Sequence, residues 1–327
     1  MSAPSLTIAL PSKGRIQEGC FEFFAAAGIP VSKGSDARGY TGALKNVPGV
    51  EVMFLSAGEI PGVLESGVAH LGITGEDLIL ERAANPDHTI ASILPLGFAR
   101  ADVVVAVPQS WIDVHTMADL EEVSVDFHNR HRRRLRVGTK YIALTRNFFA
   151  DHGVGDYRIV ESLGATEGAP AAGSAELIVD ITSTGATLAA NNLKVLADGV
   201  ILKSEAHLAA SLTATWSSAA KKTVATILDV VQAARLAAKQ KLIRFWYDGD
   251  AAVLAADFEK TFGCTVPKNA RANAGTYMEL YCADAKLSQV ISALRARGVK
   301  EEIAAINTDY IFAETNPLFD QLMKRVR

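Results

Sequence analysis

The sequence predicts an α/β protein with mostly parallel sheets, followed by a small α+β domain of the ferredoxin-like kind. The first part is predicted because short apolar runs rich in strand formers alternate with helical patterns that end at glycines. The second part is predicted by a change of order near residue 242, where strands and helices follow as β-α-β(β)-α-β. The 327 residues also favour two or three domains over one.

The opening of the chain has the form of an α/β unit. Leu6–Leu10 is an apolar strand that ends at Pro11-Ser12-Lys13-Gly14-Arg15, and a helical pattern then runs to Gly28. Further strands are expected at Val50–Leu55, Ala69–Ile73, Ile90–Leu96 and Ala101–Val107, with a short helix at Ile60–Ser66.

The same alternation continues through the middle of the chain. Strands are expected at Arg136–Gly138, Tyr157–Val160 and Leu177–Ile181, with a helix at Leu144–His152 and a helical fragment at Met117–Leu120. At about 100 residues each, two α/β lobes fit into the first 215 or so residues. A long helix over Ala219–Lys241 follows, with an apolar stripe along one side.

The last part of the chain changes its pattern. Strands are expected at Leu242–Tyr247, Tyr277–Cys282 and Ile303–Phe312, and helices at Ala251–Phe262 and Leu287–Arg297. Such small domains commonly serve in ligand sensing and assembly, but a fold alone does not fix a function.

Composition excludes several classes of protein. Hydrophobic residues make up 49% and charged residues 21%, which is typical of a folded globular chain. The net charge of −3 disfavours general nucleic-acid binding. The three cysteines, Cys20, Cys264 and Cys282, fit no metal-ligand spacing and are expected to be reduced thiols. We see neither a signal-peptide pattern nor an apolar run of about 20 residues, so a cytoplasmic protein with no membrane partner is expected.

The segment from Ile178 to Leu188 carries the strongest chemical signal. An apolar strand delivers Asp180, and Thr182, Ser183, Thr184, Gly185, Ala186 and Thr187 follow before a helical pattern. Hydroxyls, free amides at a helix start and a glycine together form a phosphate cradle. Asp180, at the strand end, is placed to accept hydrogen bonds from ribose hydroxyls. The alternative is a turn with a threonine N-cap, and the segment is not a Walker loop, because no lysine follows the glycine.

Five segments occur in this order along the chain: Lys13-Gly14-Arg15, Gly67–Asp77, Thr139–Arg146, Gly164–Pro170, and Asp180–Thr187 with the following Asn191 or Asn192, Leu193 and Ser204-Glu205-Ala206. Together they resemble the ATP phosphoribosyltransferase family, over roughly residues 5–210. Two positions depart from the family: His70 stands where an acid is usual, and Ser56 where many members carry an arginine.

The resemblance implies a two-lobed core like that of type II periplasmic binding proteins, with substrates in the cleft. Lobe I is expected to comprise residues 1–100 plus 190–215, and lobe II residues 101–189. Residues 216–241 are expected to form a connecting helix, and residues 242–327 a ferredoxin-like or ACT-like regulatory domain. The last region resembles the family's histidine-binding domain weakly, and no histidine-contacting residues are assigned in it.

The resemblance also implies a reaction, the first step of L-histidine biosynthesis. N1 of ATP displaces pyrophosphate from phosphoribosyl pyrophosphate (PRPP), with Mg²⁺ neutralising the departing charge. The implied partners are ATP, PRPP and L-histidine as inhibitor, in a homo-oligomer, either dimer or hexamer. The competing functions are a two-lobed small-molecule-binding protein and a catalytically silent regulatory relative.

Site roles are carried over at matching positions. Asp180 and Lys13 are the expected catalytic residues, and Asp180 is a weak candidate metal ligand, with Mg²⁺ held largely through substrate phosphates. PRPP is expected to contact Asp180, Thr182, Ser183, Thr184, Gly185, Ala186, Thr187 and Glu167. ATP is expected to contact Lys13, Arg15, Arg38, Asp77, Lys140 and Tyr141. No general base is identified.

For four features, the sequence leaves two interpretations open. Asp77 is either a nucleotide ligand or a helix cap, and Tyr141 either lines the nucleotide pocket or packs between the lobes. Glu167 either binds ribose or metal, or caps a helix. The basic run Arg130-His131-Arg132-Arg133-Arg134 is expected to be a solvated loop, with attraction of phosphates into the cleft as the alternative. Nucleic acid is disfavoured for this run, because no aromatic residues are interleaved with it.

Overall fold

The computed structural model describes residues 4–34, 40–83, 85–162, 164–267 and 275–326, so Arg38 lies outside the described residues. The chain forms two compact units. The first comprises Met1–Phe23, Val31–Thr223 and Gln321–Arg327, and the second comprises Phe24–Pro30 and Val224–Asp320. Three sheets, of seven, five and three strands, organise the described part of the chain.

The first sheet has the order β2-β3-β4-β1-β5-β12-β6. Its strands are β1 (Leu6–Pro11), β2 (Val31–Lys33), β3 (Thr41–Leu44), β4 (Val50–Leu55), β5 (Leu71–Gly75), β6 (Ile90–Pro95) and β12 (Ala206–Ser211). β1 lies at the centre and pairs in parallel with β4 and β5. Both of its faces are covered, which is why it reads as a continuous apolar run.

The helices in the described part of this lobe are α1 (Gly14–Ala26), α2 (Ile60–Glu65), α3 (Glu76–Arg82) and α4 (Pro86–Thr89). Ile60 and Leu64 of α2 and Ile79 of α3 pack against Ala9 of β1 in one buried cluster. The strand–turn–helix opening expected from the sequence is therefore confirmed, with the helix beginning at Gly14.

The second sheet has the order β11-β7-β10-β8-β9. Its strands are β7 (Ala101–Pro108), β8 (Leu135–Thr139), β9 (Tyr157–Glu161), β10 (Leu177–Thr182) and β11 (Leu193–Ser204). β10, β8 and β9 run parallel, whereas β7 is antiparallel to both β10 and β11. The three parallel strands therefore deliver their carboxyl ends to one edge of the sheet.

Helices cover both faces of this second sheet. The helices are α5 (Met117–His131), α6 (Ile142–Asp151) and the short α7 (Ala186–Ala190). Met117 of α5 and Phe149 of α6 pack on the face that carries Val105, while Leu188 of α7 packs on the opposite face with Ala106. Alternate residues of β7 thus enter different cores, as the period of a strand requires.

Helix α5 corrects two expectations. The fragment expected at Met117–Leu120 extends to His131, because a capping box between Thr116 and Asp119 starts it and a left-handed Arg132 ends it. The basic run at 130–134 is therefore not simply a solvated loop: Arg130 and His131 form the last turn of a helix. Most residues of α5 are polar, so its short apolar stripe gives a weak helical periodicity in the sequence.

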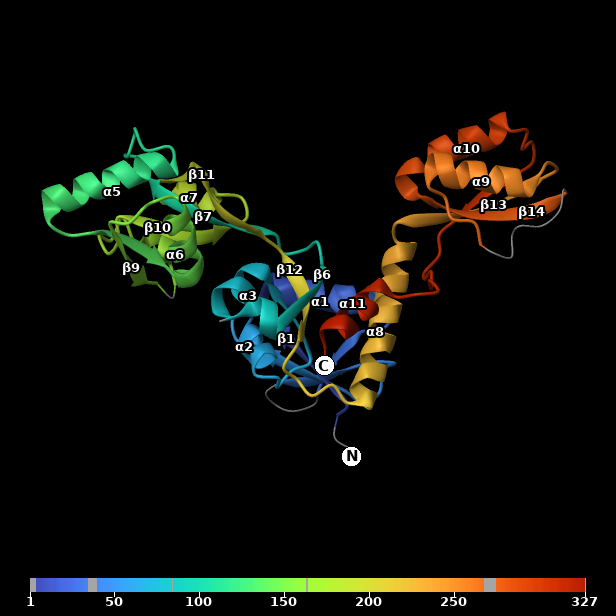
Figure 1. The fold of residues 1–327 in the computed structure, drawn as a ribbon, viewed down its shortest axis with the longest axis horizontal. Coiled ribbons are helices and arrows are strands. Elements are labelled where there is room, and N and C mark those ends of the chain that lie inside the picture. The colour runs from blue at the N-terminus through green and yellow to red at the C-terminus, as the bar shows by residue number, and fades with distance from the viewer. Residues whose placement is uncertain (1–3, 35–39, 84, 163, 268–274, 327) are drawn as a thin grey trace. The chain divides into compact units, whose positions relative to one another are not determined.

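Two crossings join the lobes, one from β6 to β7 and one from β11 to β12 (Figure 1). They lie side by side, because the Leu96 amide donates to the Ala206 carbonyl and the Ala206 amide to the Phe98 carbonyl. The segment 190–215, expected wholly in lobe I, is divided: β11 pairs with β7, and β12 pairs with β5 and β6. This is the two-lobed arrangement of type II periplasmic binding proteins.

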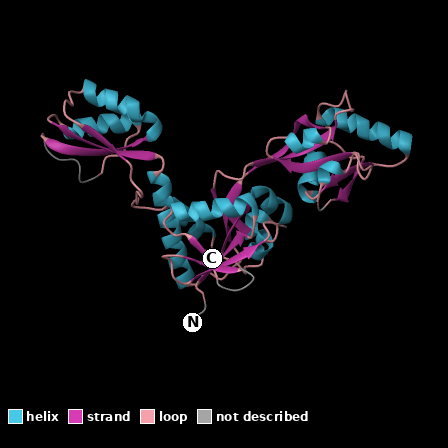
Figure 2. Cartoon of the chain, turned by 180° about the vertical axis from the view of Figure 1, so that it is seen from behind, coloured by secondary structure: helices cyan, strands magenta, loops and turns pink. Residues whose placement is uncertain are grey.

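The chain then runs through α8 (Ser218–Ala237) into the third sheet, whose order is β14-β13-β15. Its elements are β13 (Gln240–Tyr247), α9 (Ala251–Phe262), β14 (Thr276–Ala283), α10 (Leu287–Ala296) and β15 (Ile303–Ile306). Both helices cover one face of the antiparallel sheet, as both views show (Figures 1 and 2). The small C-terminal α+β domain is therefore confirmed.

Two details of the C-terminal part differ from expectation. The strand expected at Ile303–Phe312 ends at Ile306, because the polar residues Asn307, Thr308 and Asp309 interrupt the apolar run. A final helix, α11 (Pro317–Arg325), was not expected from the sequence. In the described part of the chain, we find no helix with both the length and the apolar character needed to cross a membrane.

Candidate active site

Asp180 and Lys140 meet at the carboxyl edge of the second sheet. Asp180 lies near the end of β10, and Lys140 directly follows β8, which pairs with β10 in parallel. The Lys140 ammonium nitrogen lies 4.0 Å from a carboxylate oxygen of Asp180. The Ile181 amide donates to the same oxygen over 2.8 Å. The parallel pairing of β8 with β10 thus brings one acid and one base together.

Burial of Asp180 raises the pKa of its carboxyl above the ordinary value. The hydrogen bond from the Ile181 amide and the nearby Lys140 charge act in the opposite direction, and Glu167 adds repulsion. The carboxylate is therefore partly desolvated without a fully compensating partner. A group in that state interacts strongly with a ligand that brings hydrogen-bond donors or positive charge.

The hydroxyl-rich loop after β10 is shaped by its own threonines. The Gly185 amide donates to the Thr182 hydroxyl over 2.9 Å, and the Ala186 amide approaches the Thr184 hydroxyl at 3.4 Å. Gly185 has φ +74°, and a Cβ atom there would meet nothing within 4 Å. Glycine is therefore required by the left-handed conformation and not by space. The alternative of a threonine N-cap is wrong, because the N-cap of α7 is Gly185, and Thr182 and Thr184 instead hold the turn that precedes the helix.

This loop lines a cavity of about 340 Å³. The lining residues are Arg15, Lys140, Glu167, Asp180, Ile181, Thr182, Ser183, Thr184, Thr187 and Leu188. Cations, carboxylates and hydroxyls therefore face one space, and the apolar contribution is small. A ligand with several hydroxyls and phosphate groups matches that lining.

A second cavity of about 330 Å³ adjoins the first and shares Arg15, Lys140, Ile181 and Ser183 with it. The rest of its lining is Lys13, Gly14, Ile16, Gly75, Asp77, Leu78, Ala99, Ala101 and Tyr141. Arg15, from lobe I, donates to the Ser183 hydroxyl of lobe II over 3.0 Å. The two cavities therefore share a wall that carries two positive charges, which suits two polyanionic ligands held next to each other.

Asp77 and Tyr141 are placed differently from the other lining residues. Asp77 is 5% exposed and Tyr141 is 1% exposed. The Tyr141 hydroxyl donates to one carboxylate oxygen of Asp77, and the Ser204 hydroxyl donates to the other, both over 2.8 Å. Burial and the Asp77 carboxylate raise the pKa of Tyr141. Their polar atoms bond each other, so this pair contributes shape to the cavity and joins the two lobes.

Three features of the site were not predicted from the sequence. Glu81 of α3 accepts hydrogen bonds from the Ala143 and Leu144 amides, which caps α6 of the other lobe. Ser204 fixes Asp77 from the returning chain. Ala99, which lines the second cavity, has φ +54°, a strained conformation for alanine. Only Ser204 lay within a quoted motif.

The two departures from the family pattern do not line either cavity. His70 accepts from the Thr7 amide and packs edge-on against Trp216 at 5.2 Å, and burial lowers its pKa. Ser56 donates to Glu59 over 2.6 Å, which closes a local turn. Both residues thus have structural partners outside the cavity linings.

The residues named as site candidates are mostly brought together. Apart from Arg38, every charged or hydroxyl-bearing candidate lines one of the two cavities. Gly185 and Ala186 form the turn behind the loop without lining either space. Among the described residues, no group of three or more His, Cys, Asp or Glu side chains is arranged to hold a metal ion.

Two adjoining cavities lined by cations and hydroxyls, in a two-lobed α/β core, suit a protein that handles phosphorylated ligands. Residues 56–233 match the family model described as ATP phosphoribosyltransferase. The chain belongs to the ATP phosphoribosyltransferase family.

Curated relatives match over almost the whole length. A protein named ATP phosphoribosyltransferase from Bradyrhizobium diazoefficiens is 50% identical over 322 residues, 98% of each chain. A protein of the same name from Rhodopseudomonas palustris is 51% identical over 322 residues, again 98% of each chain. Among solved structures, a chain of the ATP phosphoribosyl transferase (HisG:HisZ) complex from Thermotoga maritima aligns with a TM-score of 0.53 and 24% identity. That alignment covers 69% of this chain and 98% of the other, and it supports the fold.

Proposed function

We propose that the chain transfers the 5-phosphoribosyl group of PRPP to N1 of ATP and releases pyrophosphate, the first step of L-histidine biosynthesis. The observation that carries the proposal is the pair of adjoining cavities with Arg15 and Lys140 in their shared wall. PRPP occupies the cavity lined by the Asp180–Thr187 loop, and ATP occupies the cavity lined by Lys13, Asp77 and Tyr141.

The chemistry needs positioning and charge more than proton transfer. As N1 forms its bond to C1 of the ribose, the bond from C1 to the pyrophosphate oxygen breaks, and pyrophosphate leaves with the electron pair. N1 already has a lone pair, so no base is required for the attack. Holding the two reactants in adjoining cavities supplies much of the rate gain by removing the cost of encounter.

Asp180 is the proposed catalytic carboxylate. Positive charge develops on the ribose ring as pyrophosphate departs, and a partly desolvated carboxylate that grips the ribose hydroxyls stabilises this charge. Lys13, Arg15 and Lys140 are proposed to hold the phosphates of the two substrates. Ser183, Thr184 and Thr187 donate from the loop, and Gly185 and Ala186 supply its backbone turn.

Mg²⁺ is proposed to arrive with the substrates. Asp180 and Glu167 line the same cavity, and carboxylate oxygens are ligands that Mg²⁺ accepts. Two carboxylates beside Lys140 fit an ion that takes most of its ligands from phosphates and water. When bound, Mg²⁺ neutralises charge on the leaving pyrophosphate.

We further propose that the C-terminal domain inhibits the enzyme when L-histidine binds, and that the chain works in the cytoplasm as a homo-oligomer. The regulatory part of this proposal rests on the place and α+β architecture of the third sheet. Titration of turnover with L-histidine tests it, and full activity at millimolar histidine contradicts it. Sedimentation measurements distinguish a dimer from a hexamer.

The decisive experiment is a turnover assay with purified chain, ATP, PRPP and Mg²⁺, in which phosphoribosyl-ATP and pyrophosphate are followed. We expect both products in equal amounts from the chain alone. A two-lobed binding protein or a silent relative releases no pyrophosphate, so an inactive chain that still binds PRPP in calorimetry would replace the proposal with one of those functions.

A further inference from the structure

A third cation-lined cavity lies on lobe II, outside the site described above. Its volume is about 520 Å³, and the residues that line it are Arg133, Arg134, Arg136 and Arg158. They come from the turn after α5, from the start of β8 and from the start of β9. The cavity includes Arg133 and Arg134 of the basic run, which the proposed reaction does not use.

The cavity sits at the end of the strands opposite to the active site. Arg136 is the second residue of β8, while Lys140 follows its last residue. Four residues of extended chain span about 13 Å. The same relation holds in β10, where Glu176 precedes the strand and Asp180 lies near its end. A ligand in the arginine cavity is therefore bound at a place separate from the substrates.

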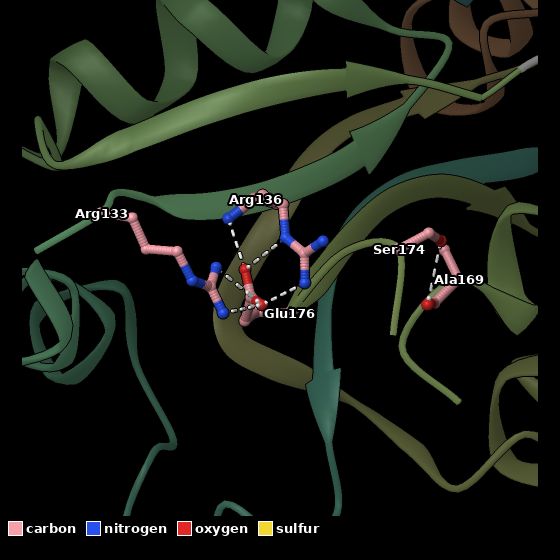
Figure 3. A network of polar contacts seen from close by, with 5 residues as sticks. All are labelled: Arg133, Arg136, Ala169, Ser174 and Glu176. Carbon is pink, nitrogen blue, oxygen red and sulfur yellow. Dashed lines mark hydrogen bonds and ion pairs between the residues drawn. The ribbon is translucent and has the colours of Figure 1, made fainter. Parts of the chain in front are cut away.

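Two of the four arginines share a single carboxylate, that of Glu176. Glu176 accepts from the Arg136 guanidinium over 2.7 Å, from the Arg136 amide over 2.7 Å, and from Arg133 over 3.1 Å (Figure 3). The Arg133 guanidinium also lies 4.7 Å from the centre of the Phe127 ring. Both carboxylate oxygens of Glu176 are occupied, so this acid holds the two arginines in place and has little capacity for the others.

The other two arginines are less closely paired with carboxylates. Arg134 lies 3.8 Å from Asp156, beyond hydrogen-bond distance, and that carboxylate oxygen is taken by His128 at 2.7 Å. Arg158 is exposed on the edge strand and has no ion pair with a carboxylate among the residues that the structure describes. Four guanidinium groups thus face two carboxylates, which leaves two positive charges.

The strand register makes this arrangement costly when the cavity holds no anion. Arg136 and Arg158 are direct partners in the parallel ladder between β8 and β9, so they lie side by side on one face of the sheet. Like charges at paired positions destabilise a sheet. An anion between them removes the repulsion and gains charge-assisted hydrogen bonds from planar donor groups.

We propose that this cavity is a binding site for a phosphate-bearing anion, such as inorganic phosphate, pyrophosphate or the phosphate group of a mononucleotide. The two excess positive charges match a dianionic phosphate, and the volume suits one small ligand. Nucleic acid fits less well, because Phe127, the ring that Arg133 contacts, also packs against His131 and is unavailable for base stacking.

The test is a titration of the full chain with pyrophosphate, followed by NMR signals of backbone amides and arginine side chains. We expect saturable shifts at residues 134–136 and 157–159, separate from shifts of the Thr182–Thr187 loop. Arg158→Gln is expected to weaken binding at this cavity about tenfold or more, because it removes a charge-assisted contact. Arg134→Gln is the second variant, in case the first alters the edge strand.

Arg130→Gln is the matched control. Arg130 is 74% exposed on the same lobe and pairs with Asp126 without lining the cavity, so its loss changes the net charge equally. We expect less than a twofold effect from this variant. An equal loss in Arg130→Gln, shifts confined to Thr182–Thr187, or no saturation by about 10 mM pyrophosphate overturns the proposal.

The source of the phosphate is read from parallel titrations with inorganic phosphate and AMP. Equal affinity for AMP and phosphate identifies recognition of the phosphate group alone, while tighter binding of AMP identifies a nucleotide; either result supports the site. Because the readout is binding at named residues and not turnover, the inference stands or falls independently of the proposed reaction.

Discussion

The two ends of the lobe II sheet each carry a carboxylate beside basic groups, but nearby groups shift the pKa values of the two carboxylates in opposite directions. At the carboxyl ends of β8 and β10, Asp180 is half-buried, 4.0 Å from Lys140, and burial raises its pKa. At the amino ends, Glu176 is gripped by Arg136 and Arg133, and their hydrogen bonds outweigh its burial to hold its pKa at about 2. One acid is satisfied by the protein, and the other is left for a ligand.

This difference separates a group that holds the fold from a group available for chemistry. A carboxylate with several charge-assisted hydrogen bonds stabilises the folded chain. A carboxylate that is desolvated without equal compensation reduces stability, and such groups concentrate at functional sites. Sequence position alone does not distinguish them, since Glu176 directly precedes β10 and Asp180, only four residues later, lies within it.

The largest expected effect is on turnover in Asp180→Asn. We expect kcat to fall about 10²-fold or more, because the carboxylate no longer stabilises the developing positive charge. The melting temperature is expected to be unchanged or about 1 °C higher, because a desolvated charge is removed. Steady-state kinetics and thermal unfolding measure the two effects, and near-normal kcat contradicts the catalytic assignment.

The next effect is expected in Lys140→Gln. Lys140 lines both cavities, so its loss is expected to raise KM for ATP and for PRPP and to lower kcat/KM by about 10-fold or more for each. Arg130→Gln is the control that removes a charge from the same lobe outside the cavities, and we expect its kinetics to stay within about twofold. A change in KM for one substrate only would assign Lys140 to a single cavity.

Glu176→Gln is expected to lower stability and to leave turnover nearly unchanged, which is the opposite of the result expected for Asp180→Asn. We expect kcat within about twofold, and a loss of about 2 kcal/mol in the free energy of unfolding of lobe II, because two guanidinium groups lose their acceptor charge. Hydrogen exchange at the β8 and β10 amides measures this local loss. A large fall in kcat with unchanged exchange would place Glu176 in the catalytic machinery instead.

Comparison with the same variant isolates the pH dependence that Glu176 gives to the stability of the parent chain. The folded-state pKa of Glu176, about 2, lies below the ordinary value of 4.5, so its contribution to stability is present above pH 4.5. The contribution is lost as pH falls toward 2, because protons then bind the unfolded chain more readily. Stability of the parent chain should therefore fall more steeply between pH 5 and 3 than that of Glu176→Gln.

Much of the fold and of the site was predictable from local patterns. Strand β10 and its loop, the turn at Lys13-Gly14-Arg15, and the alternation of strands and helices all follow from short-range signals. Helix α5 was underestimated because its cap and polar face outweigh its apolar stripe. The division of 190–215 between two sheets was missed, because an apolar strand does not reveal its partner.

Contacts between distant residues account for the rest. The bond from Tyr141 to Asp77 joins residues 64 positions apart, and the pairing of Glu176 with Arg136 spans 40 positions. No local spacing encodes either pair. Composition and motifs can name the charged residues at both ends of the sheet, but only the tertiary arrangement shows which charges are neutralised.

The smallest expected effect is in Tyr141→Phe, which tests whether the bond between the lobes or the ring itself matters. The variant keeps the ring that lines the second cavity and removes the hydroxyl that donates to Asp77, which still accepts from Ser204. We expect a loss of about 1 kcal/mol in unfolding free energy and a change of less than twofold in KM for ATP. A tenfold rise in KM at unchanged stability would instead mean that the hydroxyl turns from Asp77 to the nucleotide when ATP binds.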